Sequence, residues 1–382
     1  MQAKRFRINH LVSVLKAYEA KPVAFDAHLN FYFRSHKSLG SKDRAFVAEN
    51  AYQLIRWKGL IDALTPRPLT WEGRVETLLE VSSKLDHPKE HFDLPPHLLC
   101  SCPKTLFEIL VDQYGQEKAE EIALTNNQRA PTTLRANTLL TTRDELLKKL
   151  EVRGLSVSKT ERSPVGIQVH QKCNFFTLPE FTEGLFEVQD EASQLVAALV
   201  ETAPGEHVLD YCSGSGGKTL AFAPAMERSG QIYLHDIRKS AHVQAKKRLH
   251  RATIQTAQSL LPGHPQLKRL KKQMDWVLVD APCTGTGTYR RNPDMKWKFT
   301  PEMVDRLVEE QREIFAEALT YLKPTGRIVY ATCSLLKQEN EQQMDFFQKA
   351  HGLTVEKEPF KTLPTPGGMD GFFGVVFYRS RS

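Results

Sequence analysis

The apolar run from Trp276 to Val279, which leads into the sequence Asp-Ala-Pro-Cys, constrains the fold more than any other stretch of the chain. A run this apolar is typical of a strand that is buried on both faces of a parallel sheet. Pro282 ends the ladder because it has no N–H, and the glycines that follow allow a sharp turn. The sequence therefore predicts that Asp280 and Cys283 lie together at the carboxyl end of a central strand, where open α/β sheets bind ligands. A strand that runs into a loop with an incidental cysteine is the alternative.

Strands and helices alternate from about Gly184 onward, which predicts a doubly wound α/β sheet. A short strand ends at Asp210, and the loop Tyr-Cys-Ser-Gly-Ser-Gly-Gly-Lys-Thr follows before a helix begins. This loop lacks the first glycine of a phosphate-binding P-loop and the third glycine of a dinucleotide fingerprint. The next predicted strand leads to Asp236, an acid placed to hold ribose hydroxyls. The pattern favours a nucleoside ligand without a pyrophosphate, with a ligand-free glycine turn as the alternative.

A further predicted strand, residues 327–334, brings Cys333 to the same edge of the sheet as Cys283. Two such thiols fit three interpretations: a redox pair, although no CxxC motif is present, two packing thiols, or a catalytic pair. In the third, one thiolate adds to carbon-6 of a pyrimidine, which makes carbon-5 nucleophilic enough to attack a methyl sulfonium. An acid at the base edge stabilises this intermediate, and the second thiol assists its release.

The first half of the chain is predicted to form two smaller parts. Apolar residues recur at helical spacing from Phe6 to about Leu64, and residues 1–60 hold eleven Lys and Arg against four Asp and Glu. This excess equals the net charge of the whole chain, +7, and favours a polyanion such as nucleic acid, with a solvated helical face as the alternative. A strand at 132–137, a helix at 143–150 and a strand at 166–170 then predict a small α+β module.

Length and composition predict a globular protein of two or three domains, because 382 residues exceed one ordinary core. We expect these domains at residues 1–95, 96–185 and 186–382. No stretch has the length and apolar character of a membrane span, and no secretory signal is visible. The six cysteines show neither a disulfide framework nor the spacing of a zinc site. We therefore expect a reduced, cytoplasmic protein without a metal ion.

These motifs together resemble the RNA (cytosine-5) methyltransferases of the bacterial RsmB type, also called Fmu or Sun. The matching stretches are Asp-Ala-Pro-Cys-Thr-Gly-Thr-Gly from Asp280, Ala-Thr-Cys-Ser from Ala331, Phe-Glu-Val-Gln-Asp-Glu-Ala-Ser-Gln from Phe186 and Leu-Arg-Ala-Asn from Leu134. The Asp-x-Cys-x-Gly-x-Gly-Gly-Lys arrangement from Asp210 resembles the first motif of S-adenosylmethionine-dependent methyltransferases. The resemblance covers most of the chain, and the motifs are specific in combination, although each one alone is not.

The resemblance implies a role for each matching residue. Cys333 would be the nucleophile, Cys283 would promote product release, Asp280 would contact the target cytosine, and Lys218 would lie in the catalytic pocket. Because a Pro-Cys cysteine attacks in DNA cytosine methyltransferases, attack by Cys283 is the alternative. The residues implied to hold S-adenosylmethionine are Asp210, Cys212, Ser213, Gly214, Ser215, Gly216, Gly217, Lys218, Asp236 and Asp280.

The resemblance also implies a Rossmann-like methyltransferase domain preceded by a helical NusB-like RNA-binding domain and a small α+β RNA-recognition module. The expected function is methylation of cytosine carbon-5 in RNA through a covalent Cys–C6 adduct, with 16S ribosomal RNA as substrate. The alternatives are the same reaction on transfer RNA, and a non-catalytic RNA-binding assembly factor with a methyltransferase fold. We expect a monomer without a membrane or an obligate protein partner. The chain departs from the family at Ser213 and Ser215, which replace Ala and Pro, and residues 253–259 contain no acid for an adenine contact.

Overall fold

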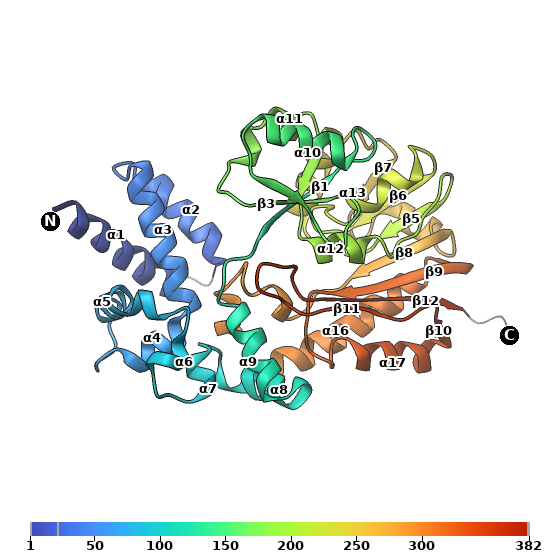
Figure 1. The fold of residues 1–382 in the computed structure, drawn as a ribbon. Helices are drawn as coiled ribbons and strands as arrows, with labels where there is room; N and C mark the ends of the chain where they lie inside the picture. The colour runs from blue at the N-terminus through green and yellow to red at the C-terminus, as the bar shows by residue number, and fades with distance from the viewer. Residues whose placement is uncertain (1, 21–22, 380–382) are drawn as a thin grey trace. The chain divides into compact units, whose positions relative to one another are not determined.

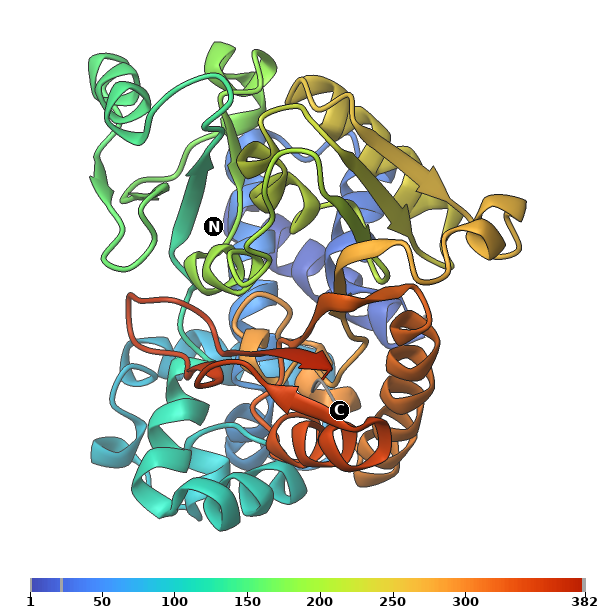
Figure 2. The ribbon, with the colours of Figure 1, turned by 90° about the vertical axis from the view of Figure 1, so that its right-hand side faces the viewer.

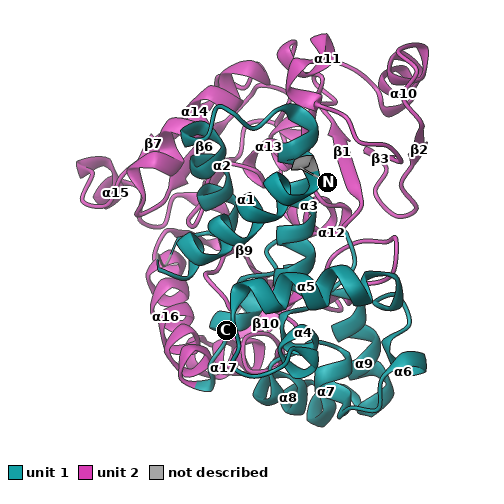
Figure 3. Ribbon diagram, turned by 90° about the vertical axis from the view of Figure 1, so that its left-hand side faces the viewer, with its two compact units in different colours: residues 1–129, 288–301 teal, residues 130–287, 302–382 magenta. Residues whose placement is uncertain are grey.

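The computed structural model describes residues 2–20 and 23–379, and these residues form two compact units (Figure 3). The first unit comprises residues 1–129 together with 288–301, and the second comprises residues 130–287 and 302–382. The first compact unit ends at residue 129, and not at the expected boundary of 95. The three-part division of the sequence stays a prediction.

The first unit is helical, as the spacing of its apolar residues predicts. Its helices are α1 (Gln2–Glu19), α2 (Phe25–Ser35), α3 (Ser41–Arg56), α4 (Lys58–Leu64), α5 (Trp71–Val81), α6 (Pro88–His91), α7 (Pro96–Leu99), α8 (Lys104–Tyr114) and α9 (Gln116–Thr125). One apolar cluster joins the first five helices, because each of them turns an apolar stripe inward. The side chains of this cluster that are fully buried include Leu11, Leu15, Val47, Leu54, Leu60, Val75 and Leu78.

Residues 288–301 are separated from the helical unit in sequence but pack within it. The indole Nε1 of Trp297 donates to the Ile55 carbonyl at 2.7 Å, and the Tyr18 hydroxyl donates to Asp294 at 3.0 Å. The ammonium of Lys296 is buried and donates to three carbonyl-type oxygens, those of Arg56, Ser101 and Asn127. The chain therefore leaves the second unit directly after the cysteine loop, an excursion that no local pattern predicts.

The second unit contains the predicted α/β sheet (Figure 1). Its strand order is β10-β12-β9-β8-β5-β6-β7, and β11 pairs with β12. Strands β5 to β9 run parallel, whereas β12 pairs antiparallel with β9. The strands are β5 (His207–Asp210), β6 (Gln231–His235), β7 (Ala257–Leu260), β8 (Met274–Asp280), β9 (Leu322–Thr332), β10 (Leu353–Val355), β11 (Phe360–Thr362) and β12 (Phe372–Arg379).

Helices cover both faces of this sheet, so its central strands are apolar on both sides. On one face α16 (Pro301–Leu319) and α17 (Glu341–His351) lie side by side (Figure 2), and the rings of Phe315 and Phe347 stack with centroids 3.8 Å apart. On the other face Leu249 of α14 (Lys239–Arg251) joins an apolar cluster with Leu278. The predicted central strand is confirmed, because residues 276–279 are at most 4% exposed.

The second unit also contains the small α+β module. Four antiparallel strands pair in the order β2-β3-β1-β4, formed by β1 (Thr132–Ala136), β2 (Val157–Lys159), β3 (Gly166–Val169) and β4 (Phe186–Val188). Thr142 and Glu145 form a capping box that starts α10 (Arg143–Val152). Short helices α11 (Pro179–Thr182) and α12 (Glu191–Ala197) precede the large sheet. Among the residues that the structure describes, none of the helices has the length and apolar character needed to cross a membrane.

Candidate active site

The candidate site lies where β5, β6, β8 and β9 end. These strands are parallel neighbours, so their carboxyl ends share one edge of the sheet. Asp210 is in register with Leu278, and Asp280 is in register with Ala331, two residues before Cys333. Four predicted site residues therefore meet at this edge: Asp210, Asp236, Asp280 and Cys333.

The glycine loop after β5 depends on backbone conformations that favour glycine. Gly216 has φ +76°, and a Cβ at this position would lie 3.4 Å from the Ala245 Cβ and from a Leu234 methyl carbon. Gly214 has φ +52°, and its N–H donates to Asp236 at 2.8 Å. Arg135 of the small module donates to the Gly217 carbonyl at 3.1 Å, so this module helps to hold the loop.

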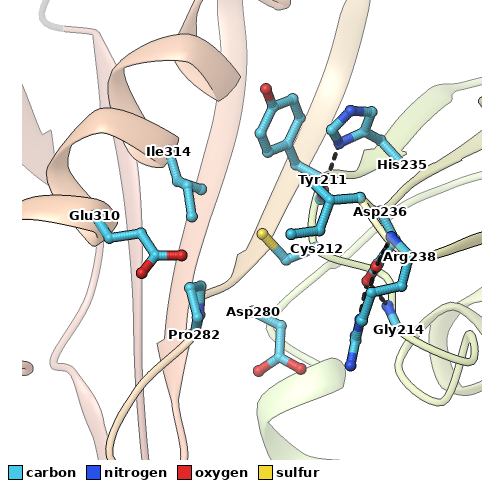
Figure 4. Close-up of a pocket in the computed structure, with 11 residues that line it drawn as sticks. Tyr211, Cys212, Gly214, His235, Asp236, Arg238, Asp280, Pro282, Glu310 and Ile314 are labelled. Atoms are coloured by element: carbon cyan, nitrogen blue, oxygen red, sulfur yellow. Dashed lines mark hydrogen bonds and ion pairs between the residues drawn. The ribbon is translucent and has the colours of Figure 1, made fainter. Parts of the chain in front are cut away.

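A cavity of about 470 Å³ opens beside this loop (Figure 4). Pro282, Glu310 and Ile314 line one side, and Asp236 and Arg238 lie on the other. Of the predicted cofactor residues, Cys212, Gly214, Asp236 and Asp280 line the cavity. The lining residues that were not among the predicted site residues are Tyr211, His235, Ile237, Arg238, Pro282, Glu310 and Ile314.

The Asp236 carboxylate is surrounded by hydrogen-bond donors. Its carboxylate is 5% exposed and accepts from the Gly214 N–H, from the Arg238 N–H and twice from the Arg238 guanidinium. Burial alone would raise the pKa of Asp236, but these hydrogen bonds outweigh it and lower the pKa to about 2. The guanidinium is largely exposed, so a ligand can displace it at little cost.

Two buried polar atoms beside the glycine loop, Asp210 Oδ1 and Ser213 Oγ, have no hydrogen-bond partner among the residues that the structure describes. The other Asp210 oxygen accepts from the Thr219 hydroxyl at 2.6 Å. Burial raises the pKa of Asp210 to about 7. Buried polar atoms are normally paired, so the two unpartnered oxygens fit a polar ligand with N–H or O–H donors at this edge.

Lys218 and Asp280 form an ion pair with a distance of 2.5 Å from Nζ to Oδ2. Lys218 is 8% exposed, and Phe372 lies beneath it with the ammonium 5.5 Å from the ring centroid. Burial disfavours the ammonium, but the Asp280 charge outweighs burial and raises the pKa of Lys218. A negative charge on Cys333 raises this pKa as well, so the ammonium lies within electrostatic reach of that sulfur.

The two predicted cysteines are brought together by the pairing of β8 with β9. The Cys283 and Cys333 sulfurs are 3.5 Å apart, and both residues are half-buried. Two backbone bonds fix the loops, from the Ala281 N–H to the Ala331 carbonyl and from the Gly287 N–H to the Cys333 carbonyl. The hydrogen bond with Cys333 and burial together raise the pKa of Cys283. Cys283 therefore keeps its proton more readily than an ordinary thiol.

Glu339 is a site residue that the sequence analysis missed. Its carboxylate is fully buried and accepts hydrogen bonds from Thr284, Ser334 and Gln311. Thr284 follows Cys283 and Ser334 follows Cys333, so one side chain holds both cysteine loops. The stretch around Glu339 looks like an ordinary polar helix start, but α17 begins only at residue 341. A buried acid cannot be told from an exposed capping acid without the fold.

Other predicted residues are near the site but do not line the cavity. Ser215 accepts a hydrogen bond from the Arg248 guanidinium at 2.7 Å, and this guanidinium also donates to Glu187. Ser213, Gly216 and Gly217 shape the loop that carries Gly214. Lys218 contacts Asp280 beside the thiols, and Asp210 lies behind the loop, bonded to Thr219. Among the described residues, no His, Cys, Asp and Glu cluster has the arrangement of a metal site.

The helical unit has a cavity of its own, of about 700 Å³. Arg56, Trp57, Asn127 and Arg129 are among the residues that line it. Burial and the neighbouring Arg129 charge lower the pKa of Arg56 to about 10. Glu49 and Asp86 line the same cavity, so it contains both arginine and carboxylate side chains.

Comparisons with known proteins show which family this chain resembles. A family model described as "16S rRNA methyltransferase RsmB/F" matches residues 197–375, and a model of the ferredoxin-like domain of RsmF/B-like methyltransferases matches residues 102–175. Ribosomal RNA small subunit methyltransferase B of Photorhabdus laumondii is 34% identical over 71% of this chain and 65% of that protein. The enzyme of the same name from Proteus mirabilis is 35% identical over 66% of this chain and 60% of that protein. The chain thus spans about three-fifths to two-thirds of the length of these relatives.

Solved structures show the fold. PH0851 has a TM-score of 0.80 at 24% identity and covers 98% of both chains. A methyltransferase homologue from Pyrococcus horikoshii has a TM-score of 0.65 at 24% identity and covers 75% of this chain and 98% of its own. The first family model spans the glycine loop, the Lys218–Asp280 pair and both cysteines of the thiol pair. The chain belongs to the RsmB/F methyltransferase family.

Proposed function

We propose that this protein transfers a methyl group from S-adenosylmethionine to carbon-5 of a cytosine in RNA, with 16S ribosomal RNA as substrate. The observation that carries the proposal is the thiol pair, Cys283 and Cys333, beside the Lys218–Asp280 ion pair at the edge of the sheet. This arrangement joins a nucleophile, a second thiol, an acid and a cation next to a cavity of nucleoside size. The names of the relatives support ribosomal RNA as the substrate.

The cavity fits the nucleoside part of S-adenosylmethionine. Asp236 would accept the ribose hydroxyls, because it is ionised and its guanidinium partner is exposed. The exposed apolar side chain of Ile237 and the ring of Pro282 both line the cavity and offer apolar surface to the adenine. Gly214 lines the cavity from the glycine loop, and the unpartnered oxygens of Asp210 and Ser213 lie within or behind the same loop. The cofactor supplies an electrophilic methyl group on a sulfonium.

Cys333 would attack carbon-6 of the cytosine as a thiolate. The Lys218 ammonium is close enough to stabilise a negative charge on that sulfur, whereas Cys283 holds its proton. Asp280 would contact the amino edge of the base, and the adjacent ammonium would stabilise negative charge that develops on the ring. Bond formation at carbon-6 moves an electron pair to carbon-5, which then accepts the methyl group. The interaction of charges therefore favours Cys333 over Cys283 as the nucleophile.

Release of the product requires the opposite electron flow. The carbon-5 proton leaves to a base, its electron pair restores the double bond between carbon-5 and carbon-6, and the bond from carbon-6 to the Cys333 sulfur breaks. Cys283 is 3.5 Å from that sulfur and is placed to assist this elimination. A variant without the Cys283 thiol should therefore stay covalently bound to its RNA.

RNA must present a base outside its stack to reach the thiols. The +7 charge of residues 1–60 supports RNA binding by the helical unit, and Arg56 and Arg129 place two guanidinium groups in its cavity. Phosphate contacts of this kind position the RNA but do not read its sequence. The choice of nucleotide would come from the fold of the RNA and from the small module.

The proposal is tested by incubating the protein with S-adenosylmethionine that carries a labelled methyl group and with either 16S ribosomal RNA or total transfer RNA. We expect label in the ribosomal RNA, and 5-methylcytidine as the labelled nucleoside after digestion. Label in transfer RNA alone would overturn the substrate, and a different methylated nucleoside would overturn the reaction. Binding of cofactor and RNA without any transfer would support the non-catalytic alternative.

A further inference from the structure

We propose that Glu339 is a positioning residue for the thiol pair: it holds the loops of both cysteines together, and its negative charge keeps the proton of the pair on Cys283. The inference rests on the proposed function. It concerns a buried acid that touches neither thiol and acts through the residue that follows each cysteine.

The contacts of Glu339 join the two loops. Its Oε1 accepts from the Thr284 N–H at 2.9 Å and from the Gln311 side-chain amide at 3.0 Å. Its Oε2 accepts from the hydroxyls of Thr284 and Ser334, both at 2.5 Å. Thr284 and Ser334 are separated by 50 residues of sequence, and their hydroxyl oxygens also lie 3.3 Å from each other. The carboxylate thereby sets the relative position of the two sulfurs.

The neighbouring residue, Asn340, strengthens the same junction. Its amide oxygen accepts from the Thr332 hydroxyl at 2.6 Å, and its amide N–H donates to the Ser334 carbonyl at 2.9 Å. Tyr330 reaches the same region from β9, because its hydroxyl donates to the Glu339 carbonyl at 2.7 Å. A short segment before α17 therefore fixes the end of β9 and the Cys333 loop, and Glu339 extends this hold to the Cys283 loop.

Four donors point at the Glu339 carboxylate, and two of them, the Thr284 N–H and the Gln311 amide, cannot accept a proton. This set of partners suits the ionised form. Burial raises the pKa of Glu339, and the hydrogen bonds from Ser334, Thr284 and Gln311 oppose that effect. Removal of the charge would leave buried donors without a strong acceptor, which is costly in a protein interior.

Charges of opposite sign, on Glu339 and Lys218, act on the two cysteines. Cys283 faces the Cys333 sulfur, the Glu339 carboxylate and the Tyr330 hydroxyl, and the Glu339 charge contributes to its raised pKa. A hydrogen bond from the Gly285 N–H acts in the opposite direction and lowers the pKa of Cys283. A negative charge on Cys333 raises the pKa of Lys218, which is paired with Asp280. We therefore infer that Cys333 forms the thiolate and that Cys283 keeps its proton.

This polarity matters to both stages of the proposed reaction. A thiolate at Cys333 is the form that adds to carbon-6, and a thiol at Cys283 does not compete with it as a nucleophile. Loss of the Glu339 charge would make Cys283 more acidic and would loosen its position beside the adduct. We therefore expect that removing the charge slows product release and leaves cofactor binding unchanged, since Glu339 does not line the cofactor cavity.

The test is the pH dependence of alkylation of each cysteine by iodoacetamide, read by peptide mass spectrometry on the full chain without RNA. In the wild type we expect Cys333 to react at a lower pH than Cys283. In Glu339→Gln the Cys283 profile should move to lower pH, by about tenfold in rate below its midpoint for each unit of pKa. Glu313→Gln, an exposed acid on α16, is the matched control and should leave both profiles unchanged.

Two results would overturn the inference: a wild type in which Cys283 reacts at lower pH than Cys333, or a folded Glu339→Gln protein with an unchanged Cys283 profile. The first of these results would overturn the inference even if Glu339→Gln does not fold. A second readout is the denaturant-resistant adduct with RNA, which should accumulate in Glu339→Gln more than in Glu313→Gln. If Cys283→Ala forms no adduct either, the proposed reaction fails, and the alkylation profiles still test Glu339 independently.

Discussion

The carboxylate of Asp236 offers a quantitative test of the cofactor cavity. We expect Asp236→Asn to weaken S-adenosylmethionine binding, because the asparagine side chain has one acceptor oxygen where the carboxylate has two. Its NH₂ group would either face the Gly214 N–H, a second donor, or stand where an acceptor for a ribose hydroxyl is needed. Asp236 accepts four hydrogen bonds in the structure, at 2.8 and 2.9 Å. A hydrogen bond to a charged group contributes about 1.5–3 kcal/mol. Loss of one such bond to the ribose therefore predicts an affinity decrease of about 10- to 150-fold.

Isothermal titration calorimetry with S-adenosylmethionine measures this effect. Asp345→Asn, the same chemical change at an exposed position of α17, is the control and should bind as the wild type does. The pKa of about 2 also predicts a pH dependence. Because the folded pKa is lowered, Asp236 contributes stability that is present above its unfolded pKa of about 4 and is lost as the pH falls toward 2. Wild-type affinity in a folded Asp236→Asn protein would refute the assignment of the ribose site.

Two further changes test other parts of the account. Lys218→Met removes the cation beside the Asp280 carboxylate and the thiol pair. We therefore expect kcat to fall about 10²–10³-fold, whereas the affinity for the cofactor stays near that of the wild type. An unchanged methylation rate under single-turnover conditions would exclude Lys218 from charge stabilisation. Arg129→Ala removes an exposed cation of the helical cavity, so RNA affinity should fall for all sequences alike and the slope of log K against log salt should decrease by about 0.9. Lys349→Ala, which removes an exposed cation on α17, is the control, and a slope in Arg129→Ala equal to that of the wild type in filter binding would contradict this role.

The part of the fold that holds the site could be predicted because it depends on local patterns. The apolar run before Asp280 and the glycine loop after Asp210 indicate their own strands and turns, and parallel strands bring their carboxyl ends to one edge. The closeness of Cys283 and Cys333 follows from the pairing of two strands that each end in a cysteine. These features need only the alternation of strands and helices.

The rest depends on long-range packing, which no local pattern records. Residues 288–301 join the helical unit because Lys296 and Trp297 find buried partners there, more than 160 residues away in sequence. Glu339 looks like a capping acid until the fold buries it against Thr284 and Ser334. Glu310 lines the cavity from α16. It lies far from the cofactor motifs in sequence, so no motif indicates it.

The central claim is that Cys333 attacks the base and Cys283 releases it. The most direct measurement incubates Cys283→Ala and Cys333→Ala with 16S ribosomal RNA and S-adenosylmethionine, followed by denaturing electrophoresis. The account predicts a denaturant-resistant protein–RNA adduct with Cys283→Ala and none with Cys333→Ala. An adduct with Cys333→Ala instead would reverse the two roles, and no adduct with either variant would contradict covalent catalysis by this pair.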